Sequence, residues 1–275
     1  MKKSNSIVMV IVVIVFAFSY CTTENDDDFS GGNGTARMEI RLADAPTDFD
    51  EVNLDIRSIS INSTDNEEKG WRELSLLRPG IYNLLDFRNG VDTLLGVYDI
   101  PAGEIRQIKL NFGTDSHTML NGFKSVIFVP VEENGERVIV KHKAQLTRDM
   151  TYRLWLDLDA ARSLVASGLG LYGPHKLEPV IRTYTDHSGG ILEGIVLPPE
   201  AKTKIWAIAN GDTLLAYPEA NGYYRFTGIA PSRLWKIIFE ASRLTYYQTV
   251  VKDSVRVERD ILTVMPVMKH PYQKS

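Results

Sequence analysis

Apolar and polar residues alternate along many short segments of this chain, and this period of two restricts most of it to extended strands. Met38, Ile40 and Leu42 would share one side of such a strand, while the residues between them are charged. A strand with one apolar face lies half-buried over a core. Similar segments recur along the chain, separated by turn sequences such as Asn89-Gly90. We therefore predict a mainly β protein with two antiparallel β-sandwich-like domains, and one or two short helices in the first.

Two features refine this prediction. The apolar phase is even at Ile56 but odd at Ile59, so we expect a β-bulge near residues 57–58. Asp159 is suited to cap a short helix over residues 160–166, and a second short helix is expected within residues 81–87. The remaining expected strands are 105–112, 125–131, 137–143, 152–158, 177–184, 192–197, 204–209, 213–217, 223–227, 236–241, 246–251, 254–257 and 261–267.

The alternating pattern breaks at residues 186–190, where the sequence reads Asp-His-Ser-Gly-Gly. We therefore divide the folded part into a β-rich domain, residues 36–186, and a β-sandwich, residues 190–270. With 275 residues, 44% of them hydrophobic, the chain has the composition of a globular protein. Its net charge of -4 and its lack of a Lys/Arg block give no electrostatic footprint for nucleic acid, so no such partner is expected.

The amino terminus has the layout of a secretory signal peptide, which we place at residues 1–20. Lys2 and Lys3 precede an apolar run over residues 7–18, which is shorter than the ~20 residues that span a membrane. Cys21, the one cysteine of the chain, follows directly. This arrangement resembles a bacterial lipoprotein signal, and the resemblance implies that Cys21 carries the lipid. The alternative is that Cys21 merely ends an ordinary signal peptide or a short anchor helix.

Residues 21–35 combine acidic residues with glycines, and we predict that they form a flexible tether. The acids are Glu24, Asp26, Asp27 and Asp28. An acidic stretch behind a lipidated cysteine is similar to the surface-export signal of lipoproteins in one Gram-negative phylum. The resemblance implies an outer-membrane protein that faces outward, whereas the simpler reading is a solvated linker.

A series of motifs in a fixed order runs through residues 36–184. The motifs are Leu42-Ala43-Asp44-Ala45-Pro46, Val52-Asn53-Leu54-Asp55-Ile56, Gly70-Trp71, Tyr82-Asn83-Leu84-Leu85, Asn89-Gly90, Leu94-Leu95, Ile100-Pro101-Ala102-Gly103, Leu156-Asp157-Leu158-Asp159-Ala160 with Ser163, and Pro179-Val180-Ile181-Arg182. With these motifs the segment resembles the bacterial lipoprotein family known only as domain of unknown function "four-three-eight-two". The resemblance implies a secreted or lipid-anchored β protein and supplies no established chemistry.

The second half carries a different set of motifs. It opens with Leu192-Glu193-Gly194-Ile195-Val196, continues with residues 222–231, and has Tyr246 ahead of a strand. Residues 190–268 thereby resemble a carboxypeptidase regulatory-like, prealbumin-type sandwich within the starch-binding-like superfold. Such motifs encode turns and core, so the resemblance implies a fold, and a function only by analogy.

No catalytic motif is present, so we predict no catalytic residues and no enzymatic activity. The one cluster that suggests chemistry is acidic: Asp157 and Asp159 lie on the same side of a predicted strand, and Asp44 could join them from the first loop. Carboxylate oxygens are ligands that calcium prefers, and calcium is the only cofactor we consider. The alternative is that Asp159 caps the following helix and Asp157 pairs with Arg153 or Arg162.

Aromatic residues suggest a second kind of site. Exposed aromatic rings stack on the faces of sugars, and the candidates are Trp206, Tyr224, Trp235 and Tyr247. The alternative is that these rings form the core of the sandwich.

Together these features predict a lipid-anchored, surface-exposed cell-envelope protein that acts as a non-catalytic binding or structural module. Its partners would be the membrane, through the lipid, and a glycan or an envelope protein. One alternative is a metal-assisted hydrolase that uses the Asp pair. Another is a subunit of a surface assembly, which an exposed apolar patch or an unpaired edge strand would favour.

Overall fold

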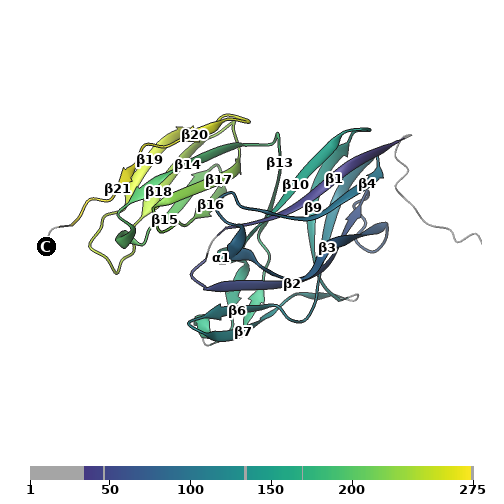
Figure 1. Ribbon diagram of the computed structural model, residues 1–275, viewed down its shortest axis with the longest axis horizontal. Helices are drawn as coiled ribbons and strands as arrows, with labels where there is room; N and C mark the ends of the chain where they lie inside the picture. Colours follow the sequence, from purple (N-terminus) through teal and green to yellow (C-terminus); the bar gives the residue numbers. More distant parts are fainter. Residues whose placement is uncertain (1–33, 46, 133–134, 169, 274–275) are drawn as a thin grey trace, which may run out of the picture.

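The computed structural model describes residues 34–45, 47–132, 135–168 and 170–273. The predicted signal peptide, Cys21 and the acids of the tether lie outside these residues. The described chain is mainly β, with sheets in a sandwich-like arrangement, as the sequence predicts (Figure 1). Within the described ranges, no helix has the length and apolar character needed to cross a membrane.

Two facing sheets form the first sandwich, which runs from β1 to β13. The smaller sheet has the order β13-β10-β1-β4, in which β1 pairs with β10 in parallel and with β4 antiparallel. Its strands are β1 (Thr35–Ala45), β4 (Thr93–Pro101), β10 (Thr151–Asp159) and β13 (Ile181–Thr185). The larger sheet has the order β11-β12-β7-β6-β2-β5-β9-β8, and β3 also pairs with β2. Its strands are β2 (Glu51–Asn62), β3 (Trp71–Asn83), β5 (Gly103–Phe112), β6 (His117–Leu120), β7 (Phe123–Phe128), β8 (Val131–Glu132), β9 (Gly135–Leu146), β11 (Leu164–Ala166) and β12 (His175–Leu177).

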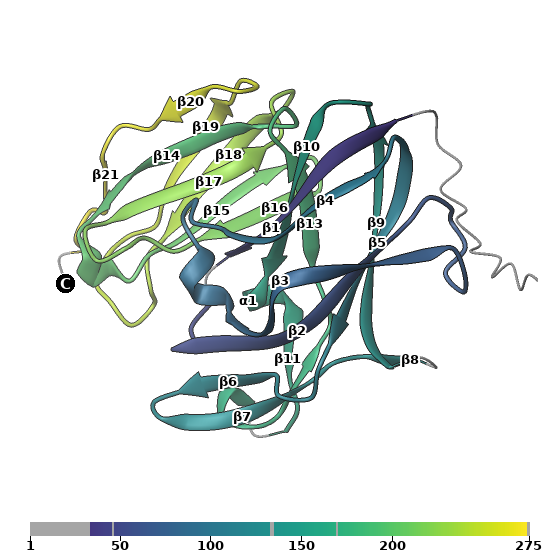
Figure 2. The ribbon, with the colours of Figure 1, turned by 45° about the vertical axis from the view of Figure 1, so that its right-hand side comes forward.

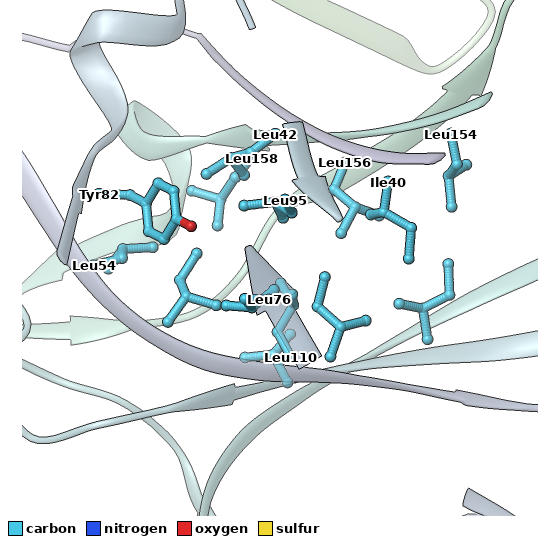
Figure 3. Packing of buried hydrophobic residues seen from close by; sticks show 14 of the residues in the cluster. Ile40, Leu42, Leu54, Leu76, Tyr82, Leu95, Leu110, Leu154, Leu156 and Leu158 are labelled. Atoms are coloured by element: carbon cyan, nitrogen blue, oxygen red, sulfur yellow. The ribbon is translucent and has the colours of Figure 1, made fainter. Parts of the chain in front are cut away.

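The core of the first sandwich lies between these two sheets. Ile40 and Leu42 of β1 and Leu156 of β10 are fully buried, so the alternation seen in the sequence marks the inner face. Figure 3 shows these side chains opposite Leu54 of β2 and Leu110 of β5. This hydrophobic cluster is drawn from residues 36–177.

The second sandwich runs from β14 to β21 and has a hydrophobic cluster of its own, drawn from residues 192–268. One sheet has the order β17-β14-β20, with β21 also pairing with β14, and the other has the order β16-β15-β18-β19. The strands are β14 (Gly190–Leu197), β15 (Lys204–Ala209), β16 (Asp212–Ala216), β17 (Tyr223–Ile229), β18 (Leu234–Glu240), β19 (Val250–Arg256), β20 (Leu262–Val264) and β21 (Met268–Lys269). The exact domain boundaries, 36–186 and 190–270, remain predictions.

Several local predictions can be compared with the structure. The bulge in β2 is confirmed, because its register shifts between Ile56 and Ser58 against both β3 and β5. Helix α1 (Ala160–Ser163) begins after Asp159, as predicted, but ends early because β11 starts at Leu164. The second predicted helix is the 3-10 helix η1 (Leu84–Phe87). Two further 3-10 turns are η2 (Gly170–Tyr172) and η3 (Pro199–Ala201).

The sequence pattern does not predict strands β3 and β4. Pro79 and Gly80 interrupt the alternation in β3, and Gly96 interrupts it in β4. Both residue types are poor strand formers, so these segments become strands because they pair with neighbouring strands. The single strand predicted over residues 177–184 is divided between β12 and β13, which belong to different sheets.

Candidate functional site

The two sandwiches approach each other at β13 and β16–β17 (Figure 2). Polar side chains join them there. Arg182 of β13 is the central contact. Its Nε donates to Asp157 Oδ2 at 3.1 Å, while its terminal nitrogens donate to the carbonyl oxygens of Thr227 and Gly228, each at 2.7 Å. The guanidinium also lies over the ring of Tyr184, 4.8 Å from its centroid. One side chain therefore links a carboxylate of the first sandwich to the backbone of the second.

The turn at Asn89-Gly90 makes a second contact across the junction. Asn89 has a φ of 54°, and its amide donates to Tyr217 O at 3.3 Å while its Oδ1 accepts from the backbone N of Arg225 at 3.4 Å. Gly90 has a φ of 84°, and a Cβ there would lie 2.8 Å from Arg225 Cδ, so any other residue would strain the backbone and displace the Arg225 side chain. The turn predicted from these two residues thus also docks on the second sandwich.

Lys204 and Asp48 make a third contact. Their Nζ and Oδ2 atoms are 2.8 Å apart, and Nζ lies 5.2 Å from the centroid of the Tyr217 ring. Burial acts to lower the pKa of Lys204, but hydrogen bonds to Asp48 and Tyr217 outweigh burial and raise it. The ammonium group therefore stays charged in this pocket.

The acidic residues singled out in the sequence do come together, around a small cavity of about 60 Å³. Asp159 accepts from the backbone N and the Nε of Arg162, so its capping role is confirmed. Asp44 accepts from Ala160 N, and Asp157 pairs with Arg182 instead of Arg153 or Arg162. Within the described residues, no group of three or more His, Cys, Asp or Glu side chains could hold a metal ion. Calcium here remains a prediction, and it would have to displace these nitrogen donors.

The four aromatic candidates differ in how deeply they are buried. Tyr224 and Trp235 are fully buried in the core of the second sandwich, so the prediction that they stack on a sugar is wrong for these two. Tyr247 is half-buried and packs edge-on against Tyr272, with ring centroids 5.3 Å apart. Trp206 is half-buried on the outer side of its sheet and lines an open crevice.

This crevice, which we call the Trp206 crevice, lies at the junction and has a volume of about 680 Å³. Residues of both sandwiches line it. Asp48 comes from the first sandwich, and Lys204, Trp206 and Tyr217 come from the second. The same four residues line a smaller adjoining cavity of about 230 Å³.

His175 lies on the wall of the smaller cavity, and sequence reasoning gave it no role. It is 1% exposed, and neither ring nitrogen has a hydrogen-bond partner among the described residues. Its ring packs edge-on against Phe49 at 5.1 Å, and burial lowers its pKa. The only signal in the sequence is the alternation of β12, which places His175 and Leu177 on the same buried side.

The stability of the protein is expected to fall at mildly acidic pH. Burial lowers the pKa of both His142 and His175 below the ordinary value of about 6.5. The unfolded chain therefore binds protons at a higher pH than the folded chain does. The free energy of unfolding should fall as the pH drops through about 6.5, by at most ~1.4 kcal/mol per pH unit for each histidine, and should be level above about pH 7.5.

Urea unfolding between pH 5.5 and pH 8 measures this dependence. His142 makes hydrogen bonds of 2.9 Å to Thr183 and Tyr152, so His142→Gln keeps a polar group there and should flatten the curve. His187 is exposed, and His187→Gln should leave the curve unchanged. An identical slope in the wild type and in His142→Gln would show that this histidine is not the cause.

Comparison with known proteins gives a family and distant structural matches. The match to the Bacillus anthracis TIE protein has 9% sequence identity and a TM-score of 0.20. It covers 86% of this chain but only 34% of that protein. A variant of the shaft pilin SpaA from Lactobacillus rhamnosus GG has 7% identity and a TM-score of 0.25, with 88% of this chain and 99% of the pilin covered. A variant of the major pilin from Streptococcus pyogenes has 11% identity and a TM-score of 0.17, with 86% of this chain and 100% of the pilin covered.

No curated protein matches the chain by sequence. A family model does match, over residues 35–179, which is more than half of the chain. The chain therefore belongs to the family described as Domain of unknown function (DUF4382).

Proposed function

We propose that this protein is a lipid-anchored, non-catalytic module of the cell envelope, in which the two sandwiches act as one rigid body. The junction between the sandwiches supports the rigid, non-catalytic part of this proposal. The charged groups of Arg182, Asp157, Lys204 and Asp48 are used to join the sandwiches, and so are the polar groups of Asn89. An arrangement in which charged side chains hold two bodies together favours a structural or binding role over a catalytic one.

The anchor is proposed from the sequence. Cys21 follows a short apolar run, and the acids Glu24, Asp26, Asp27 and Asp28 separate it from the first strand, which begins at Thr35. A lipid on Cys21 would tether the sandwiches to the Gram-negative outer membrane, and the acidic stretch supports display on the outer side. We also propose that the second sandwich is a carboxypeptidase regulatory-like domain, because its opening motif forms the central strand β14.

Replacing Cys21 with alanine tests the anchor. We expect Cys21→Ala to lose metabolic labelling with palmitate and to leave the membrane fraction, because the acylated thiol is absent. The matched control is Ser19→Ala, which keeps the cysteine and should be labelled as the wild type is. Unchanged labelling of Cys21→Ala would overturn the anchor.

Protease treatment of intact cells tests the orientation. The wild-type chain should be cleaved from outside, whereas a variant with the four acids of the tether replaced by asparagine should be protected. Full protection of the wild type would overturn outward display and leave the anchor standing.

One observation favours a second candidate function, a subunit of a surface assembly. Strand β20 lies at the edge of its sheet, with Leu262 and Val264 being 47% and 65% exposed. An apolar strand at an open edge can pair with a neighbouring chain. The hydrolase alternative gains no such support, because Asp157 and Asp159 already accept hydrogen bonds from Arg182 and Arg162.

A further inference from the structure

We infer that the Trp206 crevice binds a neutral sugar, with the indole of Trp206 as the surface on which a pyranose ring stacks. The inference names a ligand for the non-catalytic module proposed above, and it does not depend on the lipid at Cys21. It rests on the size of the crevice, the position of the indole and the balance of charge around it.

The size of the crevice fits a small part of a glycan chain. Sites for small molecules have volumes of roughly 300–1,000 Å³, and they combine aromatic side chains with a few polar groups. The Trp206 crevice measures about 680 Å³ and adjoins the smaller cavity of about 230 Å³. The second sandwich provides most of the lining of the crevice, and Asp48 of the first sandwich completes it.

The indole of Trp206 is held in one orientation. On β15, Ile205 and Ala207 point into the core, so Trp206 between them lies on the outer side of the sheet. Its Nε1 donates to Glu240 Oε2 at 2.7 Å, which fixes the ring plane. A fixed ring loses little conformational freedom on binding, and its apolar face can pack against the C–H groups of a sugar.

The charges that line the crevice favour a ligand without net charge. Its carboxylates are those of Asp48, Glu219 and Glu240, and its cations are those of Lys202, Lys204 and Arg243. An anionic ligand would meet the carboxylates, and a cationic ligand would meet the ammonium and guanidinium groups. Sugar hydroxyls both donate and accept hydrogen bonds, so they can satisfy both kinds of group.

Affinity electrophoresis of the full chain tests the inference. Gels would contain soluble starch, xyloglucan, mannan or mixed-linkage β-glucan as neutral probes, and polygalacturonate as the anionic comparison. At least one neutral polysaccharide should retard the wild type. Trp206→Ala should weaken that binding about fivefold to tenfold, the loss expected for one aromatic contact, and Trp206→Phe should restore part of it.

A control variant separates the site from general effects. Trp71→Ala removes a half-buried tryptophan of the first sandwich and should bind as the wild type does. Circular dichroism would show that each variant is folded. The inference is overturned if no neutral polysaccharide retards the wild type, if polygalacturonate alone does, or if folded Trp206→Ala binds as the wild type does. Each of these results would leave the Cys21 anchor unaffected.

Discussion

Arg182→Ala is expected to lower the free energy of unfolding by about 2–4 kcal/mol. The side chains of Arg182 and Asp157 are only 25% and 16% exposed, so the variant leaves a largely buried carboxylate without its partner. The backbone carbonyls of Thr227 and Gly228 also lose their donor. Removing one member of a buried pair costs about 3–5 kcal/mol, and the partial exposure of this pair reduces that figure.

Urea unfolding followed by circular dichroism measures this effect. Arg153→Ala is the matched control, because Arg153 also pairs with two carboxylates, those of Glu39 and Asp186, but is 44% exposed. Its loss should cost no more than about 1 kcal/mol. In the double variant with Asp157→Asn, the cost should be smaller than the sum of the single costs, because the two side chains interact. Equal destabilisation by Arg182→Ala and Arg153→Ala would show that Arg182 does not hold the sandwiches together.

Trp235→Ala is expected to cost about 3–5 kcal/mol, the usual range for removing a large aromatic side chain from a core. Trp235 is fully buried, packs in the core of the second sandwich and donates from Nε1 to Ala230 O at 2.9 Å. The variant leaves both a cavity and an unpaired carbonyl. Denaturant midpoints of purified protein measure the change.

Trp206→Ala is the control for this prediction. The two residues are both tryptophans in adjacent strands of one sheet, but Trp206 lies on the outer side and is half-buried. We expect Trp206→Ala to be clearly less destabilising, and its main effect to be on ligand binding. If the two variants were equally destabilised, the assignment of Trp206 to an open crevice would fail.

The difference between these two tryptophans was present in the sequence as a pattern. Trp235, Ile237 and Phe239 follow one another at every second position, which predicts a single apolar face. Trp206 shares its face with Lys204, which indicates the polar side of a strand. Alternation around each aromatic residue therefore predicts its burial better than the clustering of aromatic residues along the chain.

The sequence could not show the partner of Asp157. Arg153 and Arg162 are close in the chain, but Arg153 binds Glu39 and Asp186, and Arg162 binds Asp159. The partner is Arg182, which β13 places opposite Asp157 through its antiparallel register with β10. This contact results from the pairing of two strands that are distant in the sequence. The spacing of residues near Asp157 in the chain therefore does not predict it.

The sequence by itself determined the strand character of the chain, the inner faces of β1 and β10, the bulge in β2 and the cap at Asp159. Each of these follows from the geometry of a few consecutive residues, since a strand turns its side chains to alternate sides and a helix start needs a local acceptor. Only the tertiary structure decided that Arg182, Asn89 and Lys204 join the two sandwiches, and that Trp206 faces a crevice beside His175. Those arrangements depend on which strands become neighbours, and the burial of apolar surface over the whole chain selects those neighbours.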